Sequence, residues 1–66
     1  MKIRLNGEWT EAPDRETLAD LLARLGIDRR RVAVEWNREI VAKERYEAVR
    51  LGEGDSLEIV QFVGGG

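Results

Sequence analysis

The sequence predicts a small α+β domain with about four or five strands and one helix. Apolar and polar residues alternate over 2–6, as in a half-buried strand, and the runs 32–36 and 57–63 are apolar and rich in β-forming side chains. A single segment, 17–25, carries leucines at helical spacing. A lone amphipathic helix must bury its apolar stripe against another layer, so we expect the strands to form a sheet across it.

The N-terminal part of the chain predicts a β-hairpin. Apolar and polar residues alternate up to Asn6-Gly7, the dipeptide that most strongly favours a two-residue hairpin turn. The return strand is expected over 8–11, before Pro13 interrupts the pattern.

The helix is expected to begin after Thr17 and to end before Gly26. Thr17 followed three residues later by Asp20 has the pattern of a capping box. Gly26 stands where a glycine commonly terminates a helix. The expected buried stripe consists of four leucines: Leu18, Leu21, Leu22 and Leu25.

The second half of the chain predicts further strands around an irregular segment. Residues 32–36 are rich in β-forming side chains, and 40–41 should continue as a short strand after a turn. Residues 42–48 predict irregular structure or one helical turn with Tyr46 facing inward. The last strand is expected over 57–63.

The composition argues against several classes of function. Eleven basic residues against thirteen acidic ones give a net charge of −2, without the basic stripe of a nucleic-acid-binding protein. Cysteine and histidine are absent, and these are the usual zinc ligands and the usual nucleophile and base at neutral pH. No phosphate-binding glycine loop with a following Lys-Ser or Lys-Thr is found. We therefore expect no metal site and no bound cofactor, and any ATP chemistry should lie in a partner.

The sequence also predicts a cytoplasmic protein. Its apolar runs are far shorter than a membrane span, and the N-terminal residues lack the apolar core of a signal peptide. The absence of cysteine fits a reducing compartment. We expect neither a membrane nor a nucleic acid among the partners.

The glycine run Gly64-Gly65-Gly66 is the most informative feature of the chain. Glycine adds no side chain to a core and loses the most entropy on ordering, so we expect residues 1–63 to form the domain and 64–66 a flexible tail. Three extended residues reach about 10 Å. Gly64 and Gly65 could thread a narrow channel and place the Gly66 carboxylate in a partner's active site. A frayed end is the alternative.

Apolar residues beside this tail predict a docking surface. Strand alternation puts Val60 and Phe62 on the face of Glu58, away from the helix. These three residues are our candidates for contact with a partner. The alternative is that Phe62 covers a sheet edge or the irregular segment 42–48.

Other conspicuous side chains receive structural interpretations. Arg29–Arg31 should lie in a solvated loop, because acidic residues surround them. Trp36 is expected to pack in the core or on the sheet, and Trp9 to be partly exposed. Several dispersed carboxylates are interpreted as surface charges rather than as an acid–base site: Glu8, Glu11, Asp14 and Glu16.

Two runs resemble the sulfur carrier family of thiamine biosynthesis, ThiS. They are VAVEWNREIV at 32–41 and GDSLEIVQFVGGG at 54–66. The Asn-Gly hairpin and the capping box are similar as well, so the resemblance covers essentially the whole chain. It implies the ubiquitin-like β-grasp fold, a mixed sheet wrapped on one helix with the first and last strands parallel at its centre.

The chain departs from the family pattern at two places. Ala42-Lys43 stands where relatives often carry Pro-Arg, and Trp36 is unusual beside Asn37. These departures concern partner contacts in that region and leave the tail unchanged.

The resemblance also implies a chemistry. An enzyme similar to ubiquitin-activating enzymes would adenylate the Gly66 carboxylate with ATP, and a persulfide donor would convert it to a thiocarboxylate. Thiazole synthase would then receive the sulfur. On this interpretation the chain is a co-substrate and carrier, not an enzyme. The alternatives are a sulfur carrier for molybdopterin, cysteine or tRNA thiolation, a ubiquitin-like modifier of lysines, and an interaction module with an inert tail.

Overall fold

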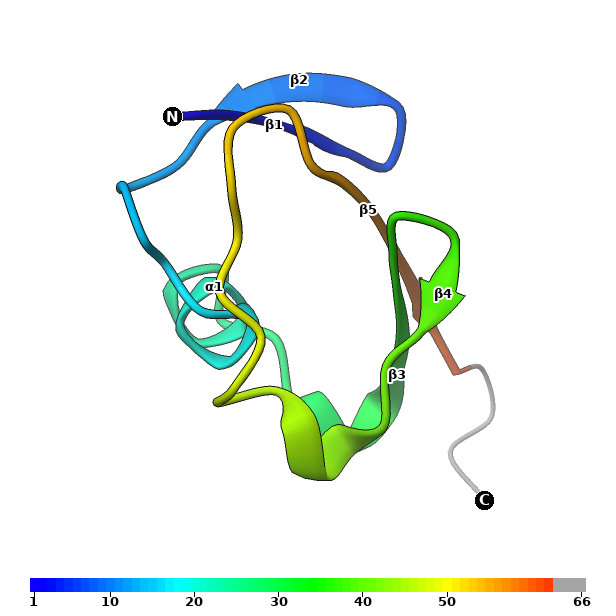
Figure 1. Ribbon diagram of the computed structural model, residues 1–66. Helices are drawn as coiled ribbons and strands as arrows, with labels where there is room; N and C mark the ends of the chain where they lie inside the picture. The colour runs from blue at the N-terminus through cyan, green and yellow to red at the C-terminus, as the bar shows by residue number, and fades with distance from the viewer. Residues whose placement is uncertain (63–66) are drawn as a thin grey trace.

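Five strands form one mixed sheet that curves around a single helix (Figure 1). The computed structural model describes residues 1–62. Its regular elements are β1 (Lys2–Leu5), β2 (Glu8–Glu11), α1 (Leu18–Arg24), β3 (Val32–Trp36), β4 (Glu39–Ile40) and β5 (Ser56–Gln61). Two 3-10 turns, η1 (Arg29–Arg31) and η2 (Lys43–Arg45), precede β3 and follow β4. The predicted α+β class is confirmed.

The first and last strands lie together inside the sheet. The strand order is β2-β1-β5-β3-β4, in which β1 and β5 run parallel and all other neighbours run antiparallel. Arg4 is opposite Ser56 in the parallel pair. The pairing expected from the family resemblance is therefore confirmed, and β5 has a neighbouring strand on each edge.

Both hairpins turn through residues with a left-handed backbone. Asn6 and Gly7 have φ of 50° and 85°, as the Asn-Gly pattern predicts. Asn37 and Arg38 form the corresponding turn between β3 and β4, with φ of 50° and 74°. Glycine adopts such angles without penalty, whereas a residue with a Cβ is destabilised by about 1 kcal/mol. Arg38 thus occupies a position that favours glycine.

The core lies between the concave face of the sheet and α1. Tyr46 points inward from the irregular segment, as expected, whereas Leu25 is 40% exposed because the helix ends at Arg24. The largest fully buried side chains come from the helix, three strands and this segment: Tyr46, Ile3, Leu18, Leu21, Leu22, Leu57, Val32 and Val34.

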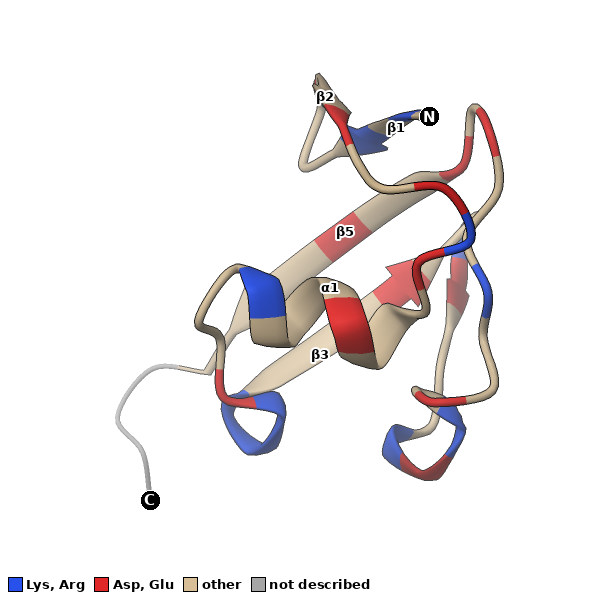
Figure 2. Ribbon diagram, turned by 90° about the vertical axis from the view of Figure 1, so that its left-hand side faces the viewer, with Lys and Arg blue, Asp and Glu red and all other residues tan. Residues whose placement is uncertain are grey.

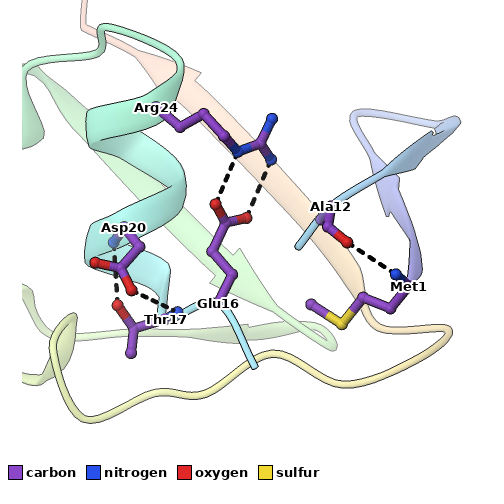
Figure 3. Close-up of polar contacts among 6 residues, drawn as sticks. All are labelled: Met1, Ala12, Glu16, Thr17, Asp20 and Arg24. Atoms are coloured by element: carbon purple, nitrogen blue, oxygen red, sulfur yellow. Dashed lines mark hydrogen bonds and ion pairs between the residues drawn. The ribbon is translucent and has the colours of Figure 1, made fainter. Parts of the chain in front are cut away.

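A capping box begins α1, and a glycine follows its end. The Asp20 N–H donates to Thr17 Oγ1 over 3.0 Å, and the Thr17 N–H donates to Asp20 Oδ2 over 3.2 Å (Figure 3). Gly26, with φ of 72°, follows the last turn. The predicted capping box and terminating glycine are both confirmed.

The prediction that Glu16 is a surface charge is wrong. Its side chain is only 4% exposed, and its two carboxylate oxygens accept hydrogen bonds from Arg24 Nε at 2.7 Å and Nη2 at 3.0 Å (Figure 3). A bidentate ionic hydrogen bond of this kind compensates for removing a carboxylate from water. The pair joins the chain entering α1 to the last turn of the helix.

The three arginines predicted to lie in a solvated loop form the short turn η1. Asp28 caps this turn, because its Oδ1 accepts hydrogen bonds from the Arg30 backbone N–H at 2.9 Å and from Arg30 Nε at 3.1 Å. Arg30 and Arg31 are exposed, as expected. The turn leads directly into β3.

Arg24→Gln should lower the free energy of unfolding by about 2 kcal/mol or more, because the buried Glu16 carboxylate loses its partner. Urea unfolding at neutral pH measures this loss. Arg45→Gln removes an exposed arginine and should change stability by less than about 0.5 kcal/mol. Equal losses in the two variants would contradict the importance of the buried pair.

Acid should weaken the cap of η1. Hydrogen bonds from the Arg30 side chain and backbone N–H lower the pKa of Asp28 from 3.8 to about 2. The pKa of Asp28 is therefore lower in the folded protein than in the unfolded chain. The stability that the cap contributes is fully present above the unfolded pKa and is lost as pH falls from about 4 to about 2. Asp28→Asn should remove this part of the acid dependence. Carboxyl-carbon NMR would contradict the assignment if Asp28 titrated near its unfolded value.

Candidate functional site

The candidate site lies at the C-terminal end of β5. The Phe62 N–H donates to the Arg31 carbonyl oxygen over 2.8 Å, which continues the pairing of β5 with the start of β3. Val32 is opposite Gln61 in the adjacent step of the ladder. The strand is therefore held in register up to the last described residue.

The predicted reactive tail lies outside the described residues. This applies to Gly64, Gly65 and Gly66, and to Val63, which was predicted to end the last strand. The structure places only the strand that leads toward them. The roles assigned to these glycines stay predictions.

The three predicted docking residues share the outer face of β5. Leu57 is buried, and Ile59 packs against the core. Glu58 alternates with them and is exposed, while Val60 and Phe62 are 57% and 54% exposed. The predicted alternation is confirmed, and contact with a partner stays a prediction.

Lys43 of η2 contacts the Phe62 ring. Its Nζ lies 5.5 Å from the ring centroid and donates to the Val32 carbonyl oxygen over 2.6 Å. The cation therefore supports the ring while leaving about half of Phe62 exposed. Phe62 thus contacts Lys43 of the irregular segment and is also exposed on the outer face.

Sequence reasoning missed other members of this outer face. Ile40 of β4 is exposed and lies opposite Glu35, and Ala33 lies opposite Val60. The register also places Glu35 opposite Glu58, and within residues 1–62 neither carboxylate forms an ion pair. Like charges opposite one another repel. The strand alternation of β4 could have identified Ile40, but its pairing with β3 was needed to place it.

Basic residues gather around the two 3-10 turns at this end of the sheet (Figure 2). Arg29 connects the turns, because it hydrogen bonds to Glu47 and to the Lys43 carbonyl oxygen, the latter at 2.7 Å. Its guanidinium also lies 5.1 Å from the centroid of the Tyr46 ring. The hydrogen bond from Arg29 lowers the pKa of the Glu47 carboxyl. Arg29 therefore links η1 to η2, whereas Arg30 and Arg31 are exposed.

Asparagine and aspartate side chains hold the other part of β5. Asn6 Oδ1 accepts from the Ile59 N–H at 2.7 Å and extends the pairing beyond the end of β1. Asp55 Oδ2 accepts from the Trp36 indole Nε1 at 2.9 Å and from the Gly52 N–H at 2.8 Å. Trp36, expected to pack in the core or on the sheet, packs against the core and also makes this polar contact. The sequence indicated a turn at Asn6, but not these contacts.

Two other kinds of site are absent from the described part of the chain. Within residues 1–62, no group of three or more acidic side chains is placed to hold a metal ion. No helix in that part of the chain combines the length and the apolar character needed to cross a bilayer. The described site is thus a strand end beside an exposed sheet face.

Comparison with known proteins identifies close relatives. The model of the ThiS family matches residues 3–66. The sulfur carrier protein ThiS of Bacillus subtilis is 46% identical, and the match covers 97% of this chain and 98% of that protein. The crystal structure of a thiamine biosynthesis protein, ThiS, from Geobacter metallireducens has a TM-score of 0.83 and 30% identity, with complete coverage of both chains.

Longer relatives contain a similar segment. A thiazole synthase of Paramagnetospirillum magneticum is 50% identical across the whole of this chain, and one of Magnetococcus marinus is 48% identical. The chain spans only 20% of the length of each of these two proteins.

The match to solved ThiS structures confirms the predicted ubiquitin-like β-grasp fold. The family match extends over nearly all of the sequence, including both runs that carry the resemblance. The chain belongs to the ThiS family.

Proposed function

We propose that this protein carries sulfur as a thiocarboxylate on Gly66 and delivers it for synthesis of the thiamine thiazole ring. One observation supports this most directly: a central strand, paired on both edges, leads to the glycine tail and presents an exposed face beside it. Such a strand fixes the position of the residues that precede the tail. Family membership supplies the pathway.

The chemistry follows from the properties of a carboxylate. A carboxylate is a poor acyl donor until one oxygen is converted to a good leaving group, which adenylation with ATP provides. The outer sulfur of a persulfide donor would then displace AMP and form an acyl disulfide with the donor. A thiol would attack the donor sulfur of that disulfide, which releases the thiocarboxylate on Gly66 and leaves a new disulfide on the donor. The thiocarboxylate would be ionised near neutral pH and would act as its own nucleophile, so a sequence without histidine suffices.

Three protein partners follow from this scheme. They are an adenylating enzyme similar to ubiquitin-activating enzymes, a persulfide donor, and thiazole synthase as the acceptor. The two thiazole synthases that contain a similar segment support the last of these. The protein itself would be a cytoplasmic co-substrate without a bound cofactor, and ATP would bind to the adenylating enzyme.

The outer face of β5 would contact these partners through Glu58, Val60 and Phe62. Two exposed apolar side chains close to the tail offer area that becomes buried in a complex. Lys43 holds the Phe62 ring in place before binding, which lowers the entropy lost on association.

Deletion of Gly65 and Gly66 should abolish thiocarboxylate formation and leave the thermal midpoint unchanged, because the deleted residues lie beyond β5. Intact-mass spectrometry of the 66-residue protein with ATP, a matched adenylating enzyme and a sulfur source measures the replacement of one oxygen by sulfur. Normal thiocarboxylate formation in the truncated protein would refute the proposal. Adducts on lysine would indicate a protein modifier instead.

Val60→Asp should raise the KM of the adenylating enzyme for this protein about tenfold, because binding would bury a new charge. The value of kcat should change little. Leu25→Asp is the control, since Leu25 is also exposed but lies at the end of α1, on the other side of the sheet. Initial rates of ATP–pyrophosphate exchange measure both variants. Equal increases in KM would refute docking through the outer face.

A further inference from the structure

A hollow of about 330 Å³ lies on the outer face of the sheet, near Ser56 at the start of β5. It lies between the β1–β2 hairpin and the β3–β4 turn, whose positions Figure 1 shows. The residues that line it come from four separate segments: Arg4, Trp9, Asn37, Arg38, Gly54 and Ser56.

Two exposed guanidinium groups border this hollow. Within residues 1–62, neither Arg4 nor Arg38 forms an ion pair, whereas arginines of α1 and η1 do. The side chain of Arg4 makes one long hydrogen bond, from Nε to the Gly7 carbonyl oxygen at 3.4 Å. The hollow therefore presents donors that can bind an anionic group.

An exposed aromatic ring lies beside these donors. Trp9 is 61% exposed and stands opposite Arg4 in the β1–β2 register. Tryptophan and arginine are the residue types most enriched among those that dominate protein interfaces. The pairing offers an apolar surface next to a positive charge.

The backbone of Arg38 gives an independent indication of function. Arg38 holds φ of 74° at a turn position where the other hairpin of this sheet has Gly7, with φ of 85°. Glycine would adopt this conformation at a lower cost, so the chain keeps an arginine at the edge of the hollow against the local backbone preference.

We propose that the hollow binds an acidic segment of the adenylating enzyme that reacts at the tail. A carboxylate of that segment would contact the guanidinium groups of Arg4 and Arg38, and a neighbouring side chain would pack on Trp9. A nucleic acid fits poorly, because the net charge is −2 and Glu58 extends from the same face. This inference rests on the proposed function and adds a second contact between this protein and the adenylating enzyme.

The position of the hollow explains what such a contact would achieve. β5 runs from Ser56 at the hollow to Gln61 next to the tail, a distance of about 17 Å at about 3.3 Å per residue. Contacts at both ends of one strand fix its direction as well as its position. The enzyme would thereby orient the tail toward its active site.

Arg38→Gly and Arg15→Gly form a matched pair for the test. Arg15 is also exposed and also has a positive φ, 64°, but does not line the hollow. Each substitution removes one positive charge and relieves the same backbone conformation. We expect Arg38→Gly to raise the KM of the adenylating enzyme about tenfold without changing kcat, and Arg15→Gly to change KM less than about twofold.

Salt dependence provides a second readout. Raising the ionic strength should increase KM for the unsubstituted protein more steeply than for Arg38→Gly, because the substitution removes a screened attraction. Thermal midpoints of both variants show that each is folded. Equal KM values for the two glycine variants would overturn the proposal.

A binding measurement separates this proposal from the proposed function. If the unsubstituted protein is not adenylated, the proposed function fails and the hollow is tested by ¹H–¹⁵N NMR with an end-capped Asp-Leu-Glu peptide. Shifts of the Arg4 and Arg38 Nε–H and Trp9 indole N–H signals support binding of an acidic segment if a Lys-Leu-Lys peptide and inorganic phosphate do not produce them. No shift with the acidic peptide, or equal shifts with phosphate, would overturn it.

Discussion

The Arg4 N–H donates to the Asp55 carbonyl oxygen and the Asn6 N–H donates to the Leu57 carbonyl oxygen, each over 2.8 Å. These hydrogen bonds join the first strand to the last and place β5 between β1 and β3. The helix packs on the sheet that these hydrogen bonds complete. The glycine tail follows β5, the strand that they hold, in the sequence. The outer face that we propose for docking is exposed because Leu57 and Ile59, which alternate with its residues, are directed into the core.

The segments without regular structure are held by specific contacts rather than by their own propensity. The segment that follows η2 accepts hydrogen bonds from the first turn of α1, from the Leu18 N–H to the Val49 carbonyl oxygen and from the Ala19 N–H to the Tyr46 carbonyl oxygen. It thus satisfies donors that a helix leaves unpaired at its start. Arg29 and Lys43 then connect the same region to η1 and to Phe62. These contacts link the exposed Phe62 ring to the segment that carries the buried Tyr46.

Local patterns predicted the elements whose causes are local. Asn6-Gly7 gave the first hairpin and Thr17 the start of the helix, because turn and cap preferences act over a few residues. The burial of Glu16 was not predictable, since it depends on where the end of the helix places Arg24. The hollow was missed for a similar reason: four segments assemble it, and each alone resembles an ordinary turn or strand. The central parallel pair came only from the family resemblance, because periodicity carries no information on strand order.

The central place of β5 also sets an order of events during synthesis. The strand made last among the described elements is needed to complete the sheet, so the domain cannot close until residues 56–61 have been translated. Pairing strands from opposite ends of a chain requires a large loop to close, which makes such folding slower than that of helical bundles. The glycines that follow β5 emerge from the ribosome after the residues that complete the core. A chain that has been translated as far as the glycines therefore already contains every strand of the described sheet.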